Sequence, residues 1–207
     1  MVADEDLVGF MRMICSGDRE SLSHTLASTP ELAVAHLAVG ASRARAGEFF
    51  LPGCGVYLYS GHTSLHVAAA AYNTALARAL VEAGADVRAR NRRGAEPIHE
   101  AANGQPGSPR WDPRRQAAVI AYLIEAGAPP DAEAAGGVTP LHRAVRNRCS
   151  AAVRVLLDAG ADPQRTNDAG STALTLARHT TGRGGSGSPE AKAEQAKIIS
   201  MLDTVAD

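Results

Sequence analysis

Two short apolar patterns alternate along most of the chain. The first places a small or polar residue ahead of a short apolar run, and it recurs as GHTSLHVAA, GAEPIHEAA, GVTPLHRAV and GSTALTLAR from Gly61, Gly94, Gly137 and Gly170. The second pattern closes the following apolar stretch as LVEAGAD, LIEAGAP and LLDAGAD, at residues 80–86, 123–129 and 156–162. Repetition at such spacings predicts a stack of similar units, each too small to bury its apolar face alone.

Each unit is predicted to hold two helices followed by a turn. Thr63 and Thr139 are expected to cap the first helix through their hydroxyls. Pro97 and Pro140 stand in its first turn, where a missing N–H costs nothing. The predicted buried positions of this helix are Leu65, Ile98, Leu141 and Leu174, and the second helix is expected to end at the left-handed glycines Gly84, Gly127 and Gly160.

These strings resemble the ankyrin repeat, in which T-P-L-H-x-A opens one helix and L-L-x-x-G-A-D ends the next. The resemblance is to bacterial-type members with long interhelix insertions. It implies an all-α ankyrin-repeat solenoid of about five helix-turn-helix units with β-turn fingers. In the family the histidine of the first string, here His66, His99 and His142, usually ties a helix end to the neighbouring turn.

The resemblance covers nearly the whole chain and implies a single domain over residues 1–207. A capping unit is expected at 1–29, with one helix at 7–16 and a second from about Asp18 to about Ala27. Complete repeats are expected at 58–90, 91–133 and 134–166, and a C-terminal repeat with a Gly-rich insertion at 167–207.

The first departure from a regular repeat is an inserted arm at residues 30–57. Leu26 and Leu65 are separated by 39 positions, where about 18 would serve in a regular stack. Within this region, residues 35–50 are compatible with a short helix. Residues 53–60 carry aromatic and β-branched side chains, which predicts an extended segment on the turn edge of the stack.

Two further insertions fall between the helices of their units, at 103–112 (NGQPGSPRWD) and at about 180–191. Asp112-Pro113 and Ser188-Pro189 then serve as the cap and first residue of the following helix. Because neighbouring helices pack about 8–10 Å apart, the two loops are expected on one edge, about 20 Å from each other. With the arm on the opposite edge, the concave groove is walled on both sides and begins to resemble a pocket.

The second of these loops fits G-x-G-x-x-G at residues 182–187. A dinucleotide cradle needs that motif directly after a strand, whereas here it follows a predicted helix. Two interpretations stay open: an anion contact through backbone N–H groups, and a flexible connector. The residues concerned are Arg183, Gly184, Gly185 and Ser186.

Recognition residues are expected on the concave face, because ankyrin proteins use their turns and inner helices for binding. The candidates are Tyr59, His62, Arg92, Arg93, Glu100, Arg143 and Arg146 in the groove, with Arg110, Trp111 and Arg148 at the loop edge. Arginines in this pattern suit a carboxylate or phosphate, and a solvated charged face is the alternative. Glu100 and Arg143 hold equivalent positions in adjacent units, so they are also expected to pair. Trp111 either anchors its loop or stacks on a partner.

Charge and cysteine content narrow the classes of function. The net charge of −1 gives no indication of a nucleic-acid partner. The sequence contains no run of about 18 apolar residues, so no membrane span is predicted. The N-terminus MVADEDLVGF does not resemble a secretory signal. The three cysteines Cys15, Cys54 and Cys149 lack close spacing, which argues against a disulfide framework or zinc site and favours the cytoplasm. Neither a metal nor a cofactor is expected.

The predicted function is a protein–protein interaction module that binds its partner through the concave groove, which is an analogy from fold to function. The alternative is a small-molecule or anion-binding protein, or an atypical enzyme, that uses the walled groove. Cys54, Tyr57, Tyr59 and His62 would then be candidates for acid–base or nucleophilic chemistry. We lean against an enzyme and assign no catalytic residue. The sequence leaves open whether the arm blocks the groove, completes it or mediates oligomerisation.

Overall fold

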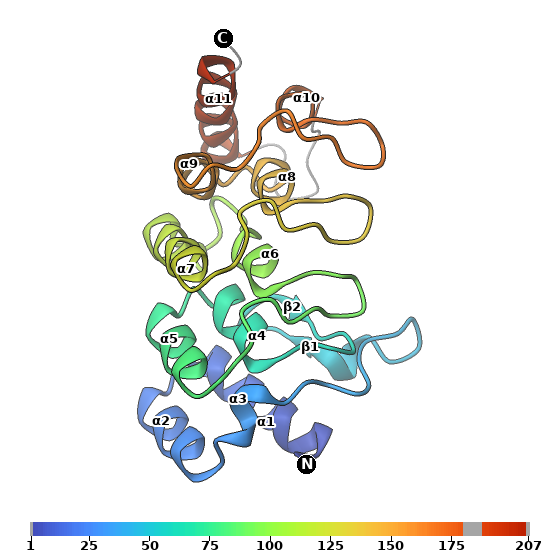
Figure 1. Ribbon diagram of the computed structural model, residues 1–207, viewed down its shortest axis with the longest axis vertical. Helices are drawn as coiled ribbons and strands as arrows, with labels where there is room; N and C mark the ends of the chain where they lie inside the picture. Colours follow the sequence, from blue (N-terminus) through green and yellow to red (C-terminus); the bar gives the residue numbers. More distant parts are fainter. Residues whose placement is uncertain (1, 180–187, 206–207) are drawn as a thin grey trace.

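The computed structural model of the protein describes residues 2–179 and 188–205. In these ranges five helix pairs stack along one axis, with the N-terminus at one end and the C-terminus at the other (Figure 1). The inner helices are α1 (Asp4–Ser16), α4 (Ser64–Ala70), α6 (Pro97–Ala101), α8 (Pro140–Arg146) and α10 (Ala173–His179). The outer helices are α2 (Arg19–Ser28), α5 (Thr74–Glu82), α7 (Pro113–Glu125), α9 (Ser150–Asp158) and α11 (Pro189–Thr204). The predicted all-α solenoid of about five units is confirmed.

The helices begin at the predicted capping residues. The Thr63 hydroxyl accepts a hydrogen bond from the His66 backbone N–H, and Thr139 does the same for His142. Asp112 accepts from the first N–H groups of α7, and Ser188 accepts from Ala191 at the start of α11. The outer helices of the three central pairs are followed by left-handed glycines, as predicted: Gly84, Gly127 and Gly160 have φ angles of 96°, 105° and 86°.

The repeated histidines tie each unit to the next. Nε2 of His66, His99 and His142 lies 3.0–3.1 Å from the carbonyl oxygens of Ala95, Val138 and Ser171 in the following finger. Nδ1 of each ring accepts a backbone N–H at the start of its own helix, so Nε2 must carry the proton and donate. All three rings are buried. The structural role implied by the family resemblance is therefore confirmed.

One contiguous apolar core runs the length of the stack, from Leu7 in α1 to Leu202 in α11. Leu65, Ile98 and Leu141 are buried as predicted. Leu174 is only half-buried, and it lies in α10, which belongs to the last helix pair of the described residues.

The arm folds differently from the prediction. It contains a single helical turn, α3 (Glu31–Val34), a 3-10 turn, η1 (Gly47–Phe49), and a hairpin of β1 (Phe50–Leu51) and β2 (Val56–Tyr57). The short helix expected within 35–50 is therefore wrong, since only the turn at 47–49 is helical. The backbone N–H groups of Ala38 and Val39 donate instead to the Asp4 carboxylate, at 3.0 and 2.9 Å. The extended character expected for 53–60 is confirmed in part by β2.

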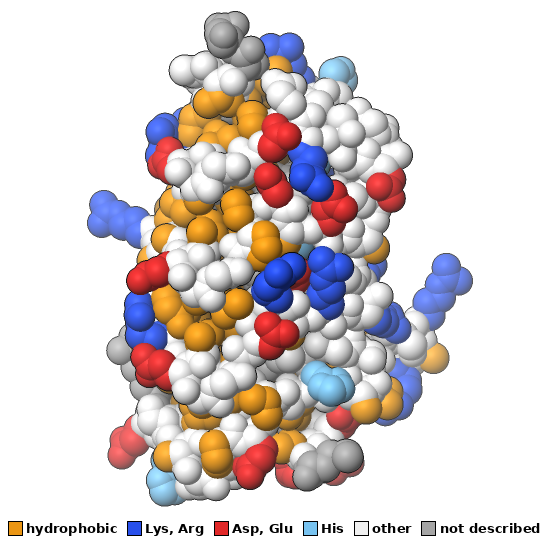
Figure 2. All heavy atoms as spheres, viewed as in Figure 1, with side chains coloured by type: hydrophobic (Ala, Val, Ile, Leu, Met, Phe, Trp, Pro, Cys, Tyr) orange, Lys and Arg blue, Asp and Glu red, His pale blue; other side chains and the backbone are white. Residues whose placement is uncertain are grey.

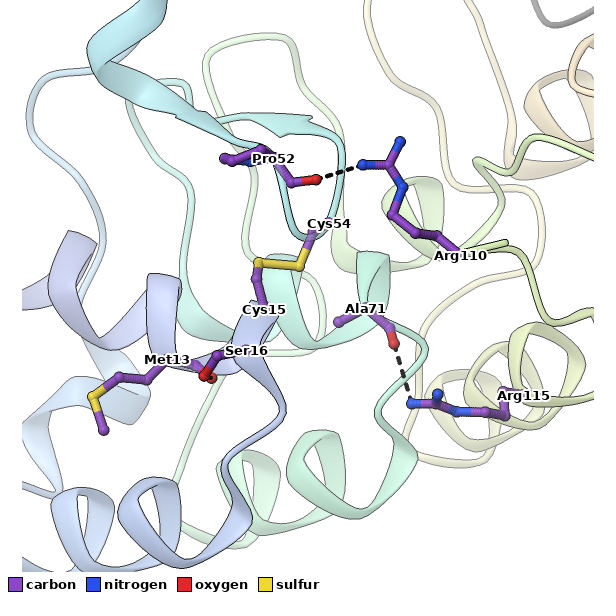
Figure 3. Close-up of a disulfide and its surroundings, with 8 residues drawn as sticks. All are labelled: Met13, Cys15, Ser16, Pro52, Cys54, Ala71, Arg110 and Arg115. Atoms are coloured by element: carbon purple, nitrogen blue, oxygen red, sulfur yellow. Dashed lines mark hydrogen bonds between the residues drawn. A yellow bond between two sulfur atoms is a disulfide. The ribbon is translucent and has the colours of Figure 1, made fainter. Parts of the chain in front are cut away.

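A disulfide joins the arm to the first helix. Cys15, near the end of α1, is bonded to Cys54 in the hairpin turn, with Cα atoms 5.4 Å apart (Figure 3). The expectation of unbridged cysteines is corrected. The two residues are 39 positions apart in sequence, and only the folded arm brings them together. Cys149 remains a free, buried thiol.

Candidate functional site

The arm and the loop at 103–112, called here the insertion loop, border a partly open cavity of about 950 Å³ on the inner-helix side of the stack. Its walls are the hairpin turn of the arm and the insertion loop. Its floor is formed by the inner helices α6 and α8, and Tyr59 and Arg93 stand on the finger side. The arm therefore forms one side of a partly open stretch of the groove.

The two walls touch each other. An Nη atom of Arg110 in the insertion loop donates to the Pro52 carbonyl in the arm (Figure 3). Gly55 lies against the same guanidinium, where a Cβ would come within 3.3 Å of Nη2. Arg115 at the start of α7 donates to the Ala71 carbonyl at 3.4 Å, below the hairpin. The disulfide and the Arg110 contact hold the hairpin turn beside the cavity, whereas the Arg115 contact joins α7 to the end of α4.

The insertion loop is itself anchored to the stack. The Trp111 indole donates to the buried Gln116 side chain at 2.9 Å, and Gln116 donates to the carbonyls of Ala101 and Asn103 at 2.9 and 3.1 Å. Gly104 packs so closely on the Cys149 thiol that a Cβ would lie 2.5 Å from Sγ. The anchoring interpretation of Trp111 is confirmed.

The cavity floor carries an ion pair within a hydrogen-bonded network. Arg143 Nη1 lies 3.2 Å from Glu100 Oε1, as predicted for equivalent positions in adjacent units. Asn103 donates to Glu100 Oε2 at 3.0 Å, and Asn147 donates to Asn103 at 3.1 Å. Burial alone would raise the pKa of Glu100, but the surrounding groups, Arg143 foremost among them, together outweigh it and the pKa lies below its ordinary value. The buried carboxylate is therefore charged and neutralised by Arg143.

The finger side of the groove presents exposed cations around one aromatic ring. The guanidinium carbons of Arg92 and Arg93 lie 4.9 and 4.7 Å from the Tyr59 ring centroid. Both arginines are exposed, and Tyr59 is half-buried. Arg146 is exposed in the last turn of α8. Of these four residues, Tyr59, Arg93 and Arg146 line the cavity.

Two predicted site residues are buried instead of facing a partner. His62 is fully buried, with Nδ1 accepting from the Tyr59 N–H at 2.9 Å and its ring packed 4.9 Å from that of His66. Its burial lowers its pKa, so the imidazole is neutral near pH 7. Arg148 is only 3% exposed, with a left-handed backbone at φ 59°. Both are corrected from surface candidates to interior residues.

Two sets of candidates remain: the Cys54 thiol and the residues of the Gly-rich loop. Cys54 has no free thiol, because it is bonded to Cys15, so the nucleophile hypothesis is wrong. Arg183, Gly184, Gly185 and Ser186 lie outside the described residues, and the anion-contact hypothesis for that loop stays a prediction.

Sequence reasoning missed several residues that shape the cavity, among them Asn103, Asn147 and Arg115. A signal for the asparagines was present. Asn73, Asn103 and Asn147 each follow shortly after an inner helix, which predicts a polar row along the groove. Arg115 had no such signal, because its contact to Ala71 spans 44 positions.

The described ranges, 2–179 and 188–205, hold neither a metal-binding cluster nor a membrane-spanning helix. No group of three or more His, Cys, Asp or Glu side chains there is placed to hold a metal ion. Nor does any helix within those ranges have the length and apolarity needed to cross a membrane.

Comparison with known proteins places the repeats in a family. The ankyrin-repeat model matches residues 60–92, and a model described as ankyrin repeats in many copies matches residues 123–177. The matches avoid the arm and the insertion loop, where the repeat pattern is interrupted. No curated protein matches the chain. The helix pairs, the capped inner helices and the histidine ties agree with these matches, and the chain is an ankyrin-repeat protein.

Proposed function

We propose that the protein binds another protein through its concave groove. Ankyrin repeats generally mediate protein–protein interaction. The proposal rests on the exposed rim of the groove. There Arg92 and Arg93 lie over the Tyr59 ring, and Arg146 is exposed on α8. Tyrosine and arginine are the side chains most often found at the energetic centre of protein interfaces.

A nucleic-acid partner is not favoured. The net charge is −1, and acidic and basic side chains are interspersed on the face seen in Figure 2. A duplex-binding protein needs a continuous basic surface to neutralise phosphates. The proposed partner is therefore a protein.

The test is affinity capture with matched charge-reversal variants. Arg92→Glu/Arg146→Glu reverses two charges at the groove, and Arg154→Glu reverses one on the exposed side of α9. Proteins bound by the wild type and by Arg154→Glu but lost from the double variant would support the groove as the binding surface. Identical sets from all three proteins, or no captured protein, would remove the basis of the proposal.

A second candidate function is binding of a small anionic molecule. It is favoured by the cavity itself, whose volume of about 950 Å³ lies within the usual range of roughly 300–1,000 Å³ for ligand pockets. Thermal shifts with nucleotides, acyl-CoA esters and carboxylic acids test it, because a ligand that binds only the folded state raises the melting temperature. Uniform absence of a shift at millimolar concentrations would count against it.

The disulfide is relevant to the cellular compartment of the protein. Disulfides persist in oxidising compartments and are rare in reducing ones. The Cys15–Cys54 bond therefore weighs against the cytoplasmic location that the sequence predicts. Mass measurement of the protein from its native cells, with free thiols alkylated before lysis, would decide between the two.

A further inference from the structure

The cavity has a surplus of positive charge. Five arginines and only two carboxylates line it: Arg93, Arg110, Arg115, Arg143 and Arg146 against Glu100 and Asp112. Glu100 is neutralised by Arg143, and Asp112 is occupied as the cap of α7. Among the described residues, the other four arginines pair with no carboxylate. An anionic ligand would therefore complement the charge of the cavity.

Two of the four arginines are already engaged in the walls. Arg110 donates to the Pro52 carbonyl and Arg115 to the Ala71 carbonyl. Arg93 rests on the face of Tyr59, which orients its guanidinium and leaves the edge donors available. Arg146 is exposed at the end of α8 and lines the same cavity. Arg93 and Arg146 are thus the cations best placed to receive a ligand.

These two cations belong to different units of the stack. Arg93 lies in the finger that precedes α6, whereas Arg146 ends α8 in the next unit. Neighbouring inner helices pack about 8–10 Å apart, so the two cations are presented to a ligand from two successive units. An extended peptide places side chains two or three residues apart at about 7–10 Å. A segment with closely spaced acidic residues can therefore place one carboxylate on the cation of each unit.

We propose that the cavity holds an extended acidic segment of a protein partner, with carboxylates on Arg93 and Arg146. This assignment rests on the proposed function and names the chemistry of the partner. The floor does not repel such a segment, because Glu100 is buried and paired with Arg143. Ligand carboxylates on exposed arginines form charge-assisted hydrogen bonds whose strength falls with added salt.

The chain supplies its own reporter, because Trp111 is its only tryptophan and it lines the cavity. The experiment titrates the full-length protein with a hexaglutamate peptide, a hexaglutamine peptide and glutarate, following tryptophan fluorescence and heat of binding. We expect saturable binding of hexaglutamate at low salt. Hexaglutamine should bind at least about 10-fold more weakly, since each lost charge-assisted contact is worth about a factor of ten.

Variants locate the site. Arg93→Gln/Arg146→Gln should weaken hexaglutamate binding at least about 10-fold, and Arg146→Gln alone should weaken it less. Arg154→Gln, on the outer face, should leave it unchanged. Both groove side chains are exposed, so the variants are expected to fold, which circular dichroism verifies.

Several results would overturn the assignment. Absence of both heat and fluorescence change with hexaglutamate would do so, as would equal affinity for hexaglutamine or for the double variant. Glutarate binding as tightly as hexaglutamate would replace the peptide with a free carboxylic acid. None of these results depends on affinity capture, so the acidic-segment proposal can fail while the groove still captures a partner of other chemistry.

Discussion

The helix-pair repeats and the inserted arm are held in place by different kinds of contact. In the three central repeats, the motif histidine accepts a backbone N–H at the start of its own inner helix and reaches one finger onward. The arm packs buried side chains into the core and is further tied by contacts between distant positions, among them Asp4 with Ala38, the Cys15–Cys54 disulfide, and Arg110 with Pro52. The repeats therefore use the same contacts several times along the stack, whereas each of these ties of the arm occurs once.

The largest expected effect comes from the arm's covalent anchor. Cys15→Ser/Cys54→Ser opens a loop closed by residues 39 positions apart, and the loop-closure relation predicts a loss of about 4 kcal/mol in the free energy of unfolding. Urea unfolding of the two proteins measures it, and the wild type in reductant provides a second measurement. A loss below about 1 kcal/mol would show that the disulfide adds little to the arm's other contacts.

Two alanine substitutions at buried leucines compare the stability of the repeats with that of the arm. Leu123 in α7 and Leu51 in β1 are 0% and 1% exposed, so either substitution by alanine should cost about 3 kcal/mol locally. Leu123→Ala is expected to lower the global free energy of unfolding, because α7 packs on both neighbouring outer helices. Leu51→Ala should mainly speed amide exchange in the arm. Equal effects on exchange throughout the chain would mean that arm and repeats unfold as one unit.

Acid should weaken the repeats through their buried histidines. Burial lowers the pKa of His66 to about 3 and that of His99 to about 4. In the unfolded chain, histidine has a pKa of about 6.5. The stability is therefore fully present above about pH 6.5, and it falls by about 1.4 kcal/mol per histidine for each pH unit below that. Urea unfolding between pH 7 and pH 5 measures the slope. A flat profile would contradict the neutral, buried state of these rings.

The smallest expected effects are those of single caps. Thr139→Ala removes the hydroxyl that caps α8, and Asp4→Ala removes the acceptor of two arm N–H groups. Each should cost about 1 kcal/mol. The Thr139 loss should appear in global unfolding, and the Asp4 loss should appear as faster exchange at Ala38 and Val39. The reverse distribution would contradict the separation of arm and scaffold.

The repeats were predictable from the sequence because their determinants are local. A threonine or aspartate at the cap, a proline in the first turn and a glycine after the last turn each act within a few residues. The pairing of Glu100 with Arg143 was also predictable, since the repeat register places equivalent positions side by side.

The arm and much of the site were not predictable, because their contacts join positions that no periodicity relates. Nothing near Cys54 indicates Cys15 as its partner, and nothing near Arg110 indicates the Pro52 carbonyl. His62 was misplaced for a related reason. Its turn position predicts exposure, but the arm packs beside it, with the Leu37 N–H donating to the His62 carbonyl.

We propose that the arm and the repeats together form the binding site. The most direct test is calorimetric titration of hexaglutamate into the wild type and into Cys15→Ser/Cys54→Ser under identical conditions, at a temperature where both are folded. An arm that is already held in place lowers the ordering cost of binding. The variant whose arm has lost its covalent anchor should therefore bind hexaglutamate more weakly. Equal affinity in the two proteins would contradict it.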